Sequence, residues 1–390
     1  MKEKNQPRKP NAIENNLFGC TVQELPKMLP GMLLAVLLVV ISIWLTDRLN
    51  SLLGFKGLIS YILTVIVAGI LVRNFVNIPS VFIPGINFCL RKLLRLGIIL
   101  MGIRLSIFDV FKIGVWGIPI VAACVVIGIA VTRYFGRLFK IPERLTALIA
   151  VGTGICGASA IVATAPGINA KYEEVTYAVA NITVFGIAAM VIYPFLAHWI
   201  FQGNTTMVGL FTGTSIHETA QVAASALIYD QTFGTSAGIT VADIATVSKL
   251  VRNALMVIVI PAITFMYTKG AGEVQTGSGR LGKALKLFPL FILGFLVAAV
   301  VRSIGDAGIR GTSIALGILS QKAWADLIKG ITLWSGYILA TAMAGVGLGT
   351  SFKSMKGLGI KPFYVGLLAA TFVGVVSIVA VFLLGRFVRI

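Results

Sequence analysis

The chain has 390 residues, of which 57% are hydrophobic and only 12% are charged. Soluble domains carry about 25% charged residues, so this composition is typical of a polytopic membrane protein rather than a soluble one. The net charge of +19 could indicate a nucleic-acid partner. The lysines and arginines lie mostly between apolar runs, as in the loops that orient membrane proteins, so the sequence predicts no nucleic-acid partner.

Cysteine and histidine are too sparse to predict a metal centre. The two histidines are His198 and His217, and the four widely spaced cysteines are Cys20, Cys89, Cys124 and Cys156. This spacing fits neither a disulfide framework nor a zinc site. We therefore predict no bound metal and no cofactor.

The apolar segments predict an all-α protein with about eleven transmembrane helices. Residues 1–25 are polar and basic and predict a cytoplasmic tail, and residues 26–390 predict one transmembrane domain. Each segment has about 20 residues, as a bilayer crossing requires, and the first lacks a clear cleavage site. The predicted spans are 28–46, 58–76, 92–108, 113–133, 145–165, 174–200, 207–228, 240–267, 285–304, 331–350 and 363–387.

Lysine and arginine predict the orientation of these spans. More of them fall in loops on the side of the N-terminus than on the other side, which favours a cytoplasmic N-terminus and an opposite C-terminus. The loop around 302–329 departs from this bias.

An internal match indicates an inverted repeat. Gly102–Leu105 resembles Gly345–Leu348, and in each case a phenylalanine and a lysine follow at similar spacing. The third span then matches the tenth and the fourth matches the eleventh. An odd offset of seven spans reverses the orientation in the membrane, as in inverted-repeat transporters. A chance match between two apolar helices is the alternative.

Two related motifs lie in the fifth and seventh spans. Gly213–Gln221 reads Gly-Thr-Ser-Ile-His-Glu-Thr-Ala-Gln, and the earlier Gly152–Ala160 also begins Gly-Thr-x-Ile. A carboxylate at lipid depth costs about 3 kcal/mol on insertion scales, so it usually faces a bundle interior or a wet path. Glycines and hydroxyls at the centres of both spans favour broken helices. We expect the two motifs to line one transport site.

The seventh span carries a candidate ion site. On a continuous helix Thr214, Glu218, Gln221 and Ser225 would share one face. We predict that Glu218, with His217, binds the coupling proton or sodium ion. Polar side chains that tie helices together are the alternative, and for the hydroxyls alone we favour it.

Two cations lie deep in the eighth span. Lys249 and Arg252 would lie roughly 12–17 Å along a helix from Val241, which is too deep for easy snorkelling. Their partner is either a structural anion, supplied by Glu218 or Asp243, or a transported one. The planar fork of arginine suits sulfate, sulfonate or carboxylate oxygens.

Glycines in the fifth span can free backbone donors for an anion, although close helix packing is the alternative. Asn181 in the next span adds a possible polar contact. The candidate substrate-binding residues are Gly152, Thr153, Gly154, Gly157, Ser159, Asn181, Thr214, Ser215, Gln221, Lys249 and Arg252.

Two patterns typical of enzymes are incomplete. Gly277–Lys283 fits GxxxxGK, but Ala284 replaces the serine or threonine and no strand precedes it. His217 and Glu218 begin like a zinc-protease helix, yet Gln221 stands where the second histidine would lie. We therefore do not expect an enzyme.

Taken together, Gly152–Ala160, Gly213–Gln221 and Lys249–Asn253 resemble the YeiH family of bacterial inner-membrane proteins, which is labelled as sulfate exporters. The resemblance runs from about the first span to the last. The family is similar to the bile acid/sodium symporter-like superfamily. That similarity implies inverted repeats with crossed, broken helices, and a location in the inner (plasma) membrane.

These observations predict a secondary active transporter of a small anion, with sulfate or an organosulfonate favoured and a proton or sodium gradient as the driving force. A membrane receptor or structural protein without transport is one alternative. An intramembrane enzyme that uses Cys156 or His217 is another.

Overall fold

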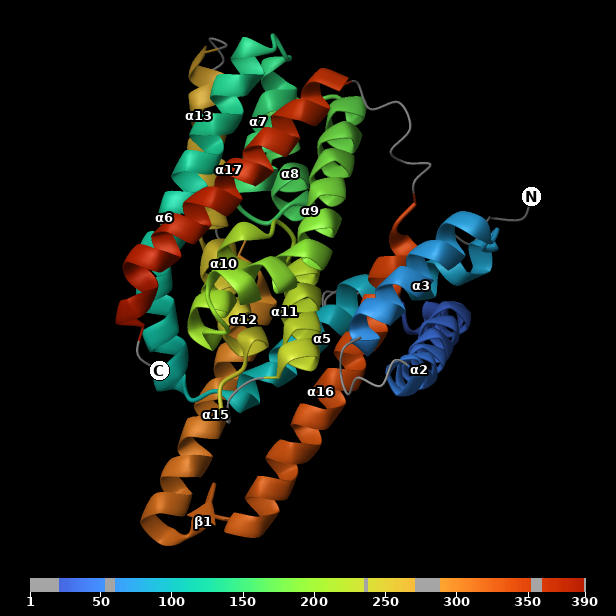
Figure 1. Cartoon of the computed structure of the whole chain (residues 1–390), viewed down its shortest axis with the longest axis vertical. Coiled ribbons are helices and arrows are strands. Elements are labelled where there is room, and N and C mark those ends of the chain that lie inside the picture. Colours follow the sequence, from blue (N-terminus) through green and yellow to red (C-terminus); the bar gives the residue numbers. More distant parts are fainter. Residues whose placement is uncertain (1–20, 53–59, 235–237, 271–287, 352–359, 389–390) are drawn as a thin grey trace, which may run out of the picture. The chain divides into compact units, whose positions relative to one another are not determined.

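The computed structural model describes residues 21–52, 60–234, 238–270, 288–351 and 360–388 (Figure 1). Most of the predicted N-terminal tail and the GxxxxGK segment at 277–283 therefore lie outside the described residues. The described chain forms two compact units. One comprises Met1–Leu100 and Leu327–Lys353, and the other comprises Met101–Asp326 and Ser354–Ile390.

The first unit is held together by close helix crossings at glycine. It contains α2 (Leu29–Leu52), α3 (Tyr61–Phe75), α4 (Ile83–Phe88), most of α5 (Leu94–Met101) and most of α16 (Gln321–Gly349). A Cβ on Gly31 would lie 2.1 Å from the Phe82 carbonyl oxygen, and one on Gly69 would lie 2.9 Å from the Cα of Gly347. The absence of side chains lets these helix backbones touch, as is common between membrane helices.

The second unit holds the two predicted motifs. Its helices are α6 (Ile107–Leu138), α7 (Glu143–Gly154), α8 (Ala158–Thr164), α9 (Tyr172–Ile200), α10 (Thr205–Ser215), α11 (Thr219–Phe233), α12 (Val241–Ala254), α13 (Met256–Gly270), α15 (Leu290–Thr312) and α17 (Ile360–Leu384). The long helices α6 and α17 run side by side, and α10 packs along α12 (Figure 1). Two strands of two residues each, β1 (Ile314–Ala315) and β2 (Leu319–Ser320), pair in an antiparallel hairpin.

The fold confirms the prediction of an all-α, polytopic membrane protein. Within the described ranges, seven helical segments are long and apolar enough to cross a membrane: Gln23–Leu52, Ile107–Leu138, Tyr172–Ile200, Val241–Met266, Leu290–Thr312, Gln321–Gly349 and Ile360–Phe387. The remaining predicted spans are short or interrupted helices.

The third predicted span was wrong at both ends. The prediction placed it at 92–108, so that Arg91, Lys92 and Arg95 would lie at its start. In the structure these residues lie within a helical segment that runs through α4, a π-helical turn at Cys89–Leu93, and α5. The segment ends at a 3₁₀ turn, Gly102–Arg104, where the prediction had placed apolar helix.

The predicted breaks in the fifth and seventh spans are confirmed. The fifth span is α7 followed by α8, with residues 155–157 between them, and the seventh is α10 followed by α11, with residues 216–218 between them. The helix pairs matched by the predicted repeat also share a unit. α6 and α17 belong to the second unit, and α4–α5 and most of α16 belong to the first.

Candidate functional site

The two helix breaks lie against each other, and we refer to residues 153–159 and 214–219, with Lys249 and Arg252, as the crossover. Gly157 allows the close approach, since its φ of +61° is one that other residues rarely adopt. A Cβ there would also lie 2.5 Å from Cγ of Glu218. Any larger residue at 157 would therefore both strain the turn and push the second break away.

Lys249 on α12 joins the two breaks. Its ammonium nitrogen, which is fully buried, donates to the carbonyl oxygen of Ile155 at 3.1 Å and to that of Ile216 at 2.9 Å. It also donates to the carbonyl of His217. All three hydrogens of an ammonium group are thereby used.

Arg252, one turn further along α12, also donates hydrogen bonds to backbone carbonyls of both breaks. Its Nε donates to the carbonyl of Gly154 at 2.9 Å, and its Nη1 donates to those of Thr214 at 2.8 Å and Ile216 at 3.1 Å. Its Nη2 donates to the carbonyl of Thr153.

These contacts identify the partner of the two buried cations. The last carbonyls of a helix have no partner within that helix, and its C-terminal end carries a partial negative charge. Lys249 and Arg252 supply donors and positive charge to the C-terminal ends of α7 and α10 at once. The sequence had suggested Glu218, Asp243 or a transported anion as their partner. In the described part of the chain, neither cation forms an ion pair with a carboxylate.

The residues around the crossover differ in how deeply they are buried. Ser159 in the first turn of α8 is exposed, and Glu218 and Thr219 are half-buried, whereas Lys249 and Arg252 are sealed. The Glu218 carboxylate accepts a hydrogen bond of 3.4 Å from the Ala158 N–H. The half-buried Glu218 thus belongs to the same break whose carbonyls accept hydrogen bonds from Lys249 and Arg252.

His217 and Thr153 bring unused polar atoms to the crossover. His217 is 2% exposed, and its Nδ1 has no hydrogen-bond partner among the described residues. The Thr153 hydroxyl oxygen is likewise buried and without a partner in the described chain. A buried nitrogen and a buried hydroxyl with free bonding capacity are candidate contacts for an ion or for water.

The glycines of the motifs mostly serve packing. Gly152 and Gly154 lie inside α7, and a Cβ on Gly152 would meet side-chain atoms of Ile161 and Ile182 at 2.8 and 2.9 Å. Gly213 lies inside α10, where a Cβ would be 2.6 Å from the Ala245 carbonyl oxygen of α12. The close packing of α12 on α10 is what brings Lys249 and Arg252 to the breaks.

The continuous polar stripe predicted for the seventh span was wrong, because the break at 216–218 divides it between two helices. Thr214 turns toward α17, where its hydroxyl lies 2.7 Å from that of Ser377, and Ser215 bonds back to the Phe211 carbonyl at 2.6 Å. Gln221 turns toward α9, where its amide donates to the Thr183 carbonyl at 3.4 Å. Helical spacing does not hold across an unwound segment.

Asn181 is not brought to the crossover. It is fully buried on α9, and its amide donates to the carbonyl of Pro362 in the first turn of α17 at 2.8 Å. Its side chain packs against Gly366, where a Cβ would lie 1.7 Å from the amide oxygen. This residue ties two helices together.

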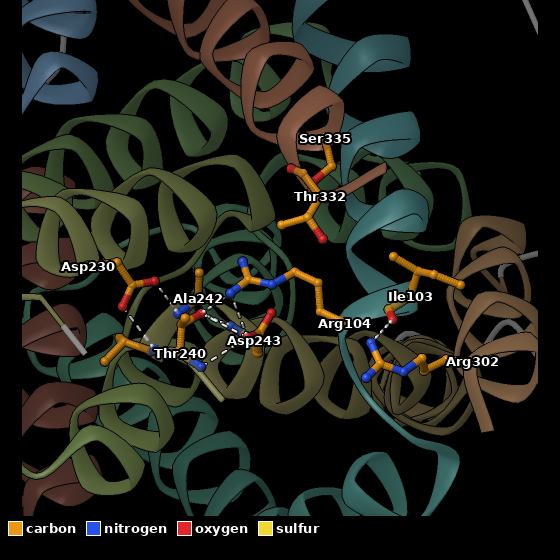
Figure 2. A network of polar contacts seen from close by, with 10 residues as sticks. Ile103, Arg104, Asp230, Thr240, Ala242, Asp243, Arg302, Thr332 and Ser335 are labelled. Carbon is orange, nitrogen blue, oxygen red and sulfur yellow. Dashed lines mark hydrogen bonds and ion pairs between the residues drawn. The ribbon is translucent and has the colours of Figure 1, made fainter. Parts of the chain in front are cut away.

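A second polar network lies at the other end of α12 (Figure 2). Asp230 of α11 accepts from the N–H groups of Val241 and Ala242, both at 3.0 Å, and so caps α12. Asp243, which is 1% exposed, accepts from the Thr240 hydroxyl at 2.8 Å and lies 3.2 Å from the Arg104 guanidinium. No local pattern indicates this pair, since Arg104 and Asp243 are 139 positions apart in the chain.

Replacing Arg104 by glutamine should destabilise the second unit. The buried carboxylate of Asp243 would lose its counter-charge, at a cost of about 1–3 kcal/mol. We expect a lower thermal unfolding temperature in detergent than for the wild type, with partial recovery in Arg104→Lys. The matched control is Arg310→Gln, which changes an exposed arginine at the end of α15. Equal unfolding temperatures for Arg104→Gln and this control would contradict the role of the pair.

The fold and the site together define an all-α, polytopic membrane protein in which two broken helices meet at a polar crossover. Comparison with known proteins agrees with this class. Residues 30–366 match the family model described as conserved hypothetical protein 698. The chain belongs to this family, UPF0324, which includes YeiH, as the resemblance at sequence level had indicated.

Its similarity to individual members extends over most of both chains. A UPF0324 membrane protein from Bacillus cereus is 34% identical over 334 residues, which is 85% of this chain and 89% of the relative. One from Fusobacterium nucleatum is 29% identical over 360 residues, which is 92% of this chain and 98% of the relative. One from Listeria monocytogenes is 31% identical over 332 residues, which is 85% of this chain and 90% of the relative.

Proposed function

We propose that this protein is a secondary active transporter that moves a small anion through the crossover of α7–α8 and α10–α11. Sulfate or an organosulfonate is the favoured substrate, and a proton or sodium gradient drives the movement. The protein would lie in the inner (plasma) membrane of a bacterium, with its N-terminus in the cytoplasm, as the distribution of lysine and arginine favours.

One observation carries the proposal: a half-buried carboxylate, Glu218, shares the crossover with two buried cations. Nearly all N–H groups of Lys249 and Arg252 donate to backbone carbonyls. These residues would therefore attract an anion by charge rather than bind it through hydrogen bonds. Part of their charge is offset by the C-terminal ends of α7 and α10. Discontinuous helices at a binding site, with backbone groups turned toward the solute, are a recurring plan in gradient-driven transporters.

The position of Glu218 also supports a coupling mechanism. Its negative charge stands at the start of α8, on the Ala158 N–H, and repels an anion that approaches the same accessible surface. A proton or sodium ion bound to Glu218 removes this repulsion. Ion and anion would therefore bind together and cross together. His217, with its unused Nδ1, would share the proton or stabilise the ion.

The test is uptake into proteoliposomes with a panel of anions, under separate proton and sodium gradients. We expect sulfate or methanesulfonate to accumulate under one inward cation gradient and not in protein-free liposomes. If no anion moves under any gradient, the proposal fails.

A receptor or structural protein without transport is the second candidate, favoured by the extent to which Lys249, Arg252, Thr214 and Gln221 tie helices together. In that case Glu218→Gln would lower detergent stability and no solute would move. An intramembrane enzyme that uses Cys156 or His217 would instead turn over a substrate without moving any solute across the bilayer.

A further inference from the structure

A cavity outside the crossover carries unpaired positive charge. It has a volume of about 290 Å³ and is lined by residues of α6, α7 and α13. Of these helices, α7 packs against both α6 and α13 (Figure 1). The polar rim of the cavity is formed by Arg133 and Arg137 of α6 with Glu143 and Thr146 of α7. Its remaining walls are apolar, from Ile141, Ala147, Ala150, Ile263 and Met266.

The two arginines lie one helical turn apart, which places them on the same face of α6. Among the described residues, neither guanidinium has a hydrogen bond or an ion pair. Like charges at this spacing repel each other, and this repulsion is relieved when an anion lies between them. Two guanidiniums on one face match the oxygens of a phosphate or sulfate group.

Thr146 adds a polar group with unused hydrogen-bonding capacity to the lining of the cavity. This residue lines the cavity and is 6% exposed, yet its hydroxyl has no hydrogen-bond partner in the described chain. A helical threonine usually bonds back to the carbonyl one turn earlier, but this hydroxyl does not. Thr146 packs against Gly136, where a Cβ would lie 2.6 Å from its hydroxyl oxygen, so the absent side chain at 136 makes room for it.

We propose that this cavity is a second anion site, which binds a phosphate- or sulfate-type oxyanion between Arg133 and Arg137 with the Thr146 hydroxyl as a further donor. The oxyanion comes from one of two sources, the headgroup of an anionic phospholipid or a free inorganic ion. The same arginines also line a shallower hollow with Ala130, Tyr134 and Leu138, a largely apolar surface that suits an acyl chain. The site does not depend on the proposed transport function.

Glu143 allows a test in which anion affinity should rise, because its exposed carboxylate also lines the cavity and repels an anion. Purified full-length protein in neutral detergent would be titrated with four probes: inorganic phosphate, inorganic sulfate, dihexanoyl-phosphatidylglycerol and zwitterionic dihexanoyl-phosphatidylcholine. Binding would be followed by the shift in thermal unfolding. Arg133→Gln/Arg137→Gln should weaken binding about ten-fold or more. Glu143→Gln should strengthen it by about two- to five-fold.

The probes separate the two sources. Binding of phosphatidylglycerol without competition from the inorganic ions identifies a lipid headgroup, and binding of phosphate or sulfate by themselves identifies a free oxyanion. Arg133→Lys/Arg137→Lys keeps the charge without the planar fork and should bind with intermediate affinity. Arg310→Gln is the control and should bind as the wild type does.

The proposal is overturned if no probe binds, or if the double glutamine variant binds like the wild type or no worse than Arg310→Gln. If the double glutamine variant does not fold, Glu143→Gln decides: higher affinity supports the site, and unchanged affinity overturns it.

Discussion

Replacing Lys249 by methionine should prevent the second unit from folding stably. Methionine fills a similar volume but donates no hydrogen bond, so the carbonyls of Ile155, Ile216 and His217 would lose their shared donor in a buried place. Each unsatisfied buried acceptor costs about 1–3 kcal/mol, so we expect a loss of about 3 kcal/mol or more. Thermal unfolding in detergent, followed by size-exclusion chromatography, measures this.

The result distinguishes a structural role of Lys249 from a role in attracting the solute. A lysine that only attracts a solute would leave a well-folded variant after substitution, and removing an uncompensated buried charge could even raise stability. Lys322→Met, at an exposed lysine in the first turn of α16, is the matched control and should unfold as the wild type does. A stable Lys249→Met protein that merely loses anion flux would contradict the structural role inferred from the hydrogen bonds.

Replacing Glu218 by glutamine should leave a folded protein that no longer couples anion movement to a cation gradient. Glutamine has the same shape, and its amide oxygen can still accept from the Ala158 N–H. Glutamine carries no negative charge, however, so the coupling proton or sodium ion loses the group that binds it. Gradient-driven uptake in proteoliposomes should fall at least about ten-fold, equivalent to about 1.4 kcal/mol.

The control for this substitution is Glu173→Gln, at an exposed glutamate in the first turn of α9. Uptake by this variant should match the wild type. Undiminished, gradient-dependent uptake by Glu218→Gln would contradict the coupling role, and a fall in its unfolding temperature would favour a structural role instead.

The sequence predicted the membrane fold and the two helix breaks because both depend on local composition. Long apolar runs give helices that can cross a bilayer, and the Gly-Thr-x-Ile motifs mark the ends of α7 and α10. Gly157, with its positive φ, is the residue that most directly requires the first break.

The partners of the buried cations could not be predicted in the same way. Backbone carbonyls are present at every residue, so nothing in the sequence marks those of residues 153–155, 214, 216 and 217 as acceptors. Only the close packing of α12 on α10 brings Lys249 and Arg252 to them. The rule that the carbonyls at a helix end need external partners could have suggested this answer, once the breaks were accepted.

The predicted stripe on the seventh span failed for a related reason. Thr214 and Gln221 share a face only on an unbroken helix, and the same motif that predicted a break invalidated the spacing argument across it. The pair formed by Arg104 and Asp243 could not be predicted from sequence patterns at all. Its residues are distant in the chain and meet only through the tertiary fold.

The central claim is that the accessible side of the crossover is wet at lipid depth. The most direct measurement is the reaction of a charged, membrane-impermeant thiol reagent with Ser159→Cys, in a chain whose own cysteines are replaced and which is reconstituted in liposomes. Val126→Cys is the control, because Val126 lies near the middle of α6 and is 65% exposed on an apolar surface. We predict that Ser159→Cys reacts rapidly while Val126→Cys does not. If both are equally unreactive, the crossover is dry and cannot be the path of an anion.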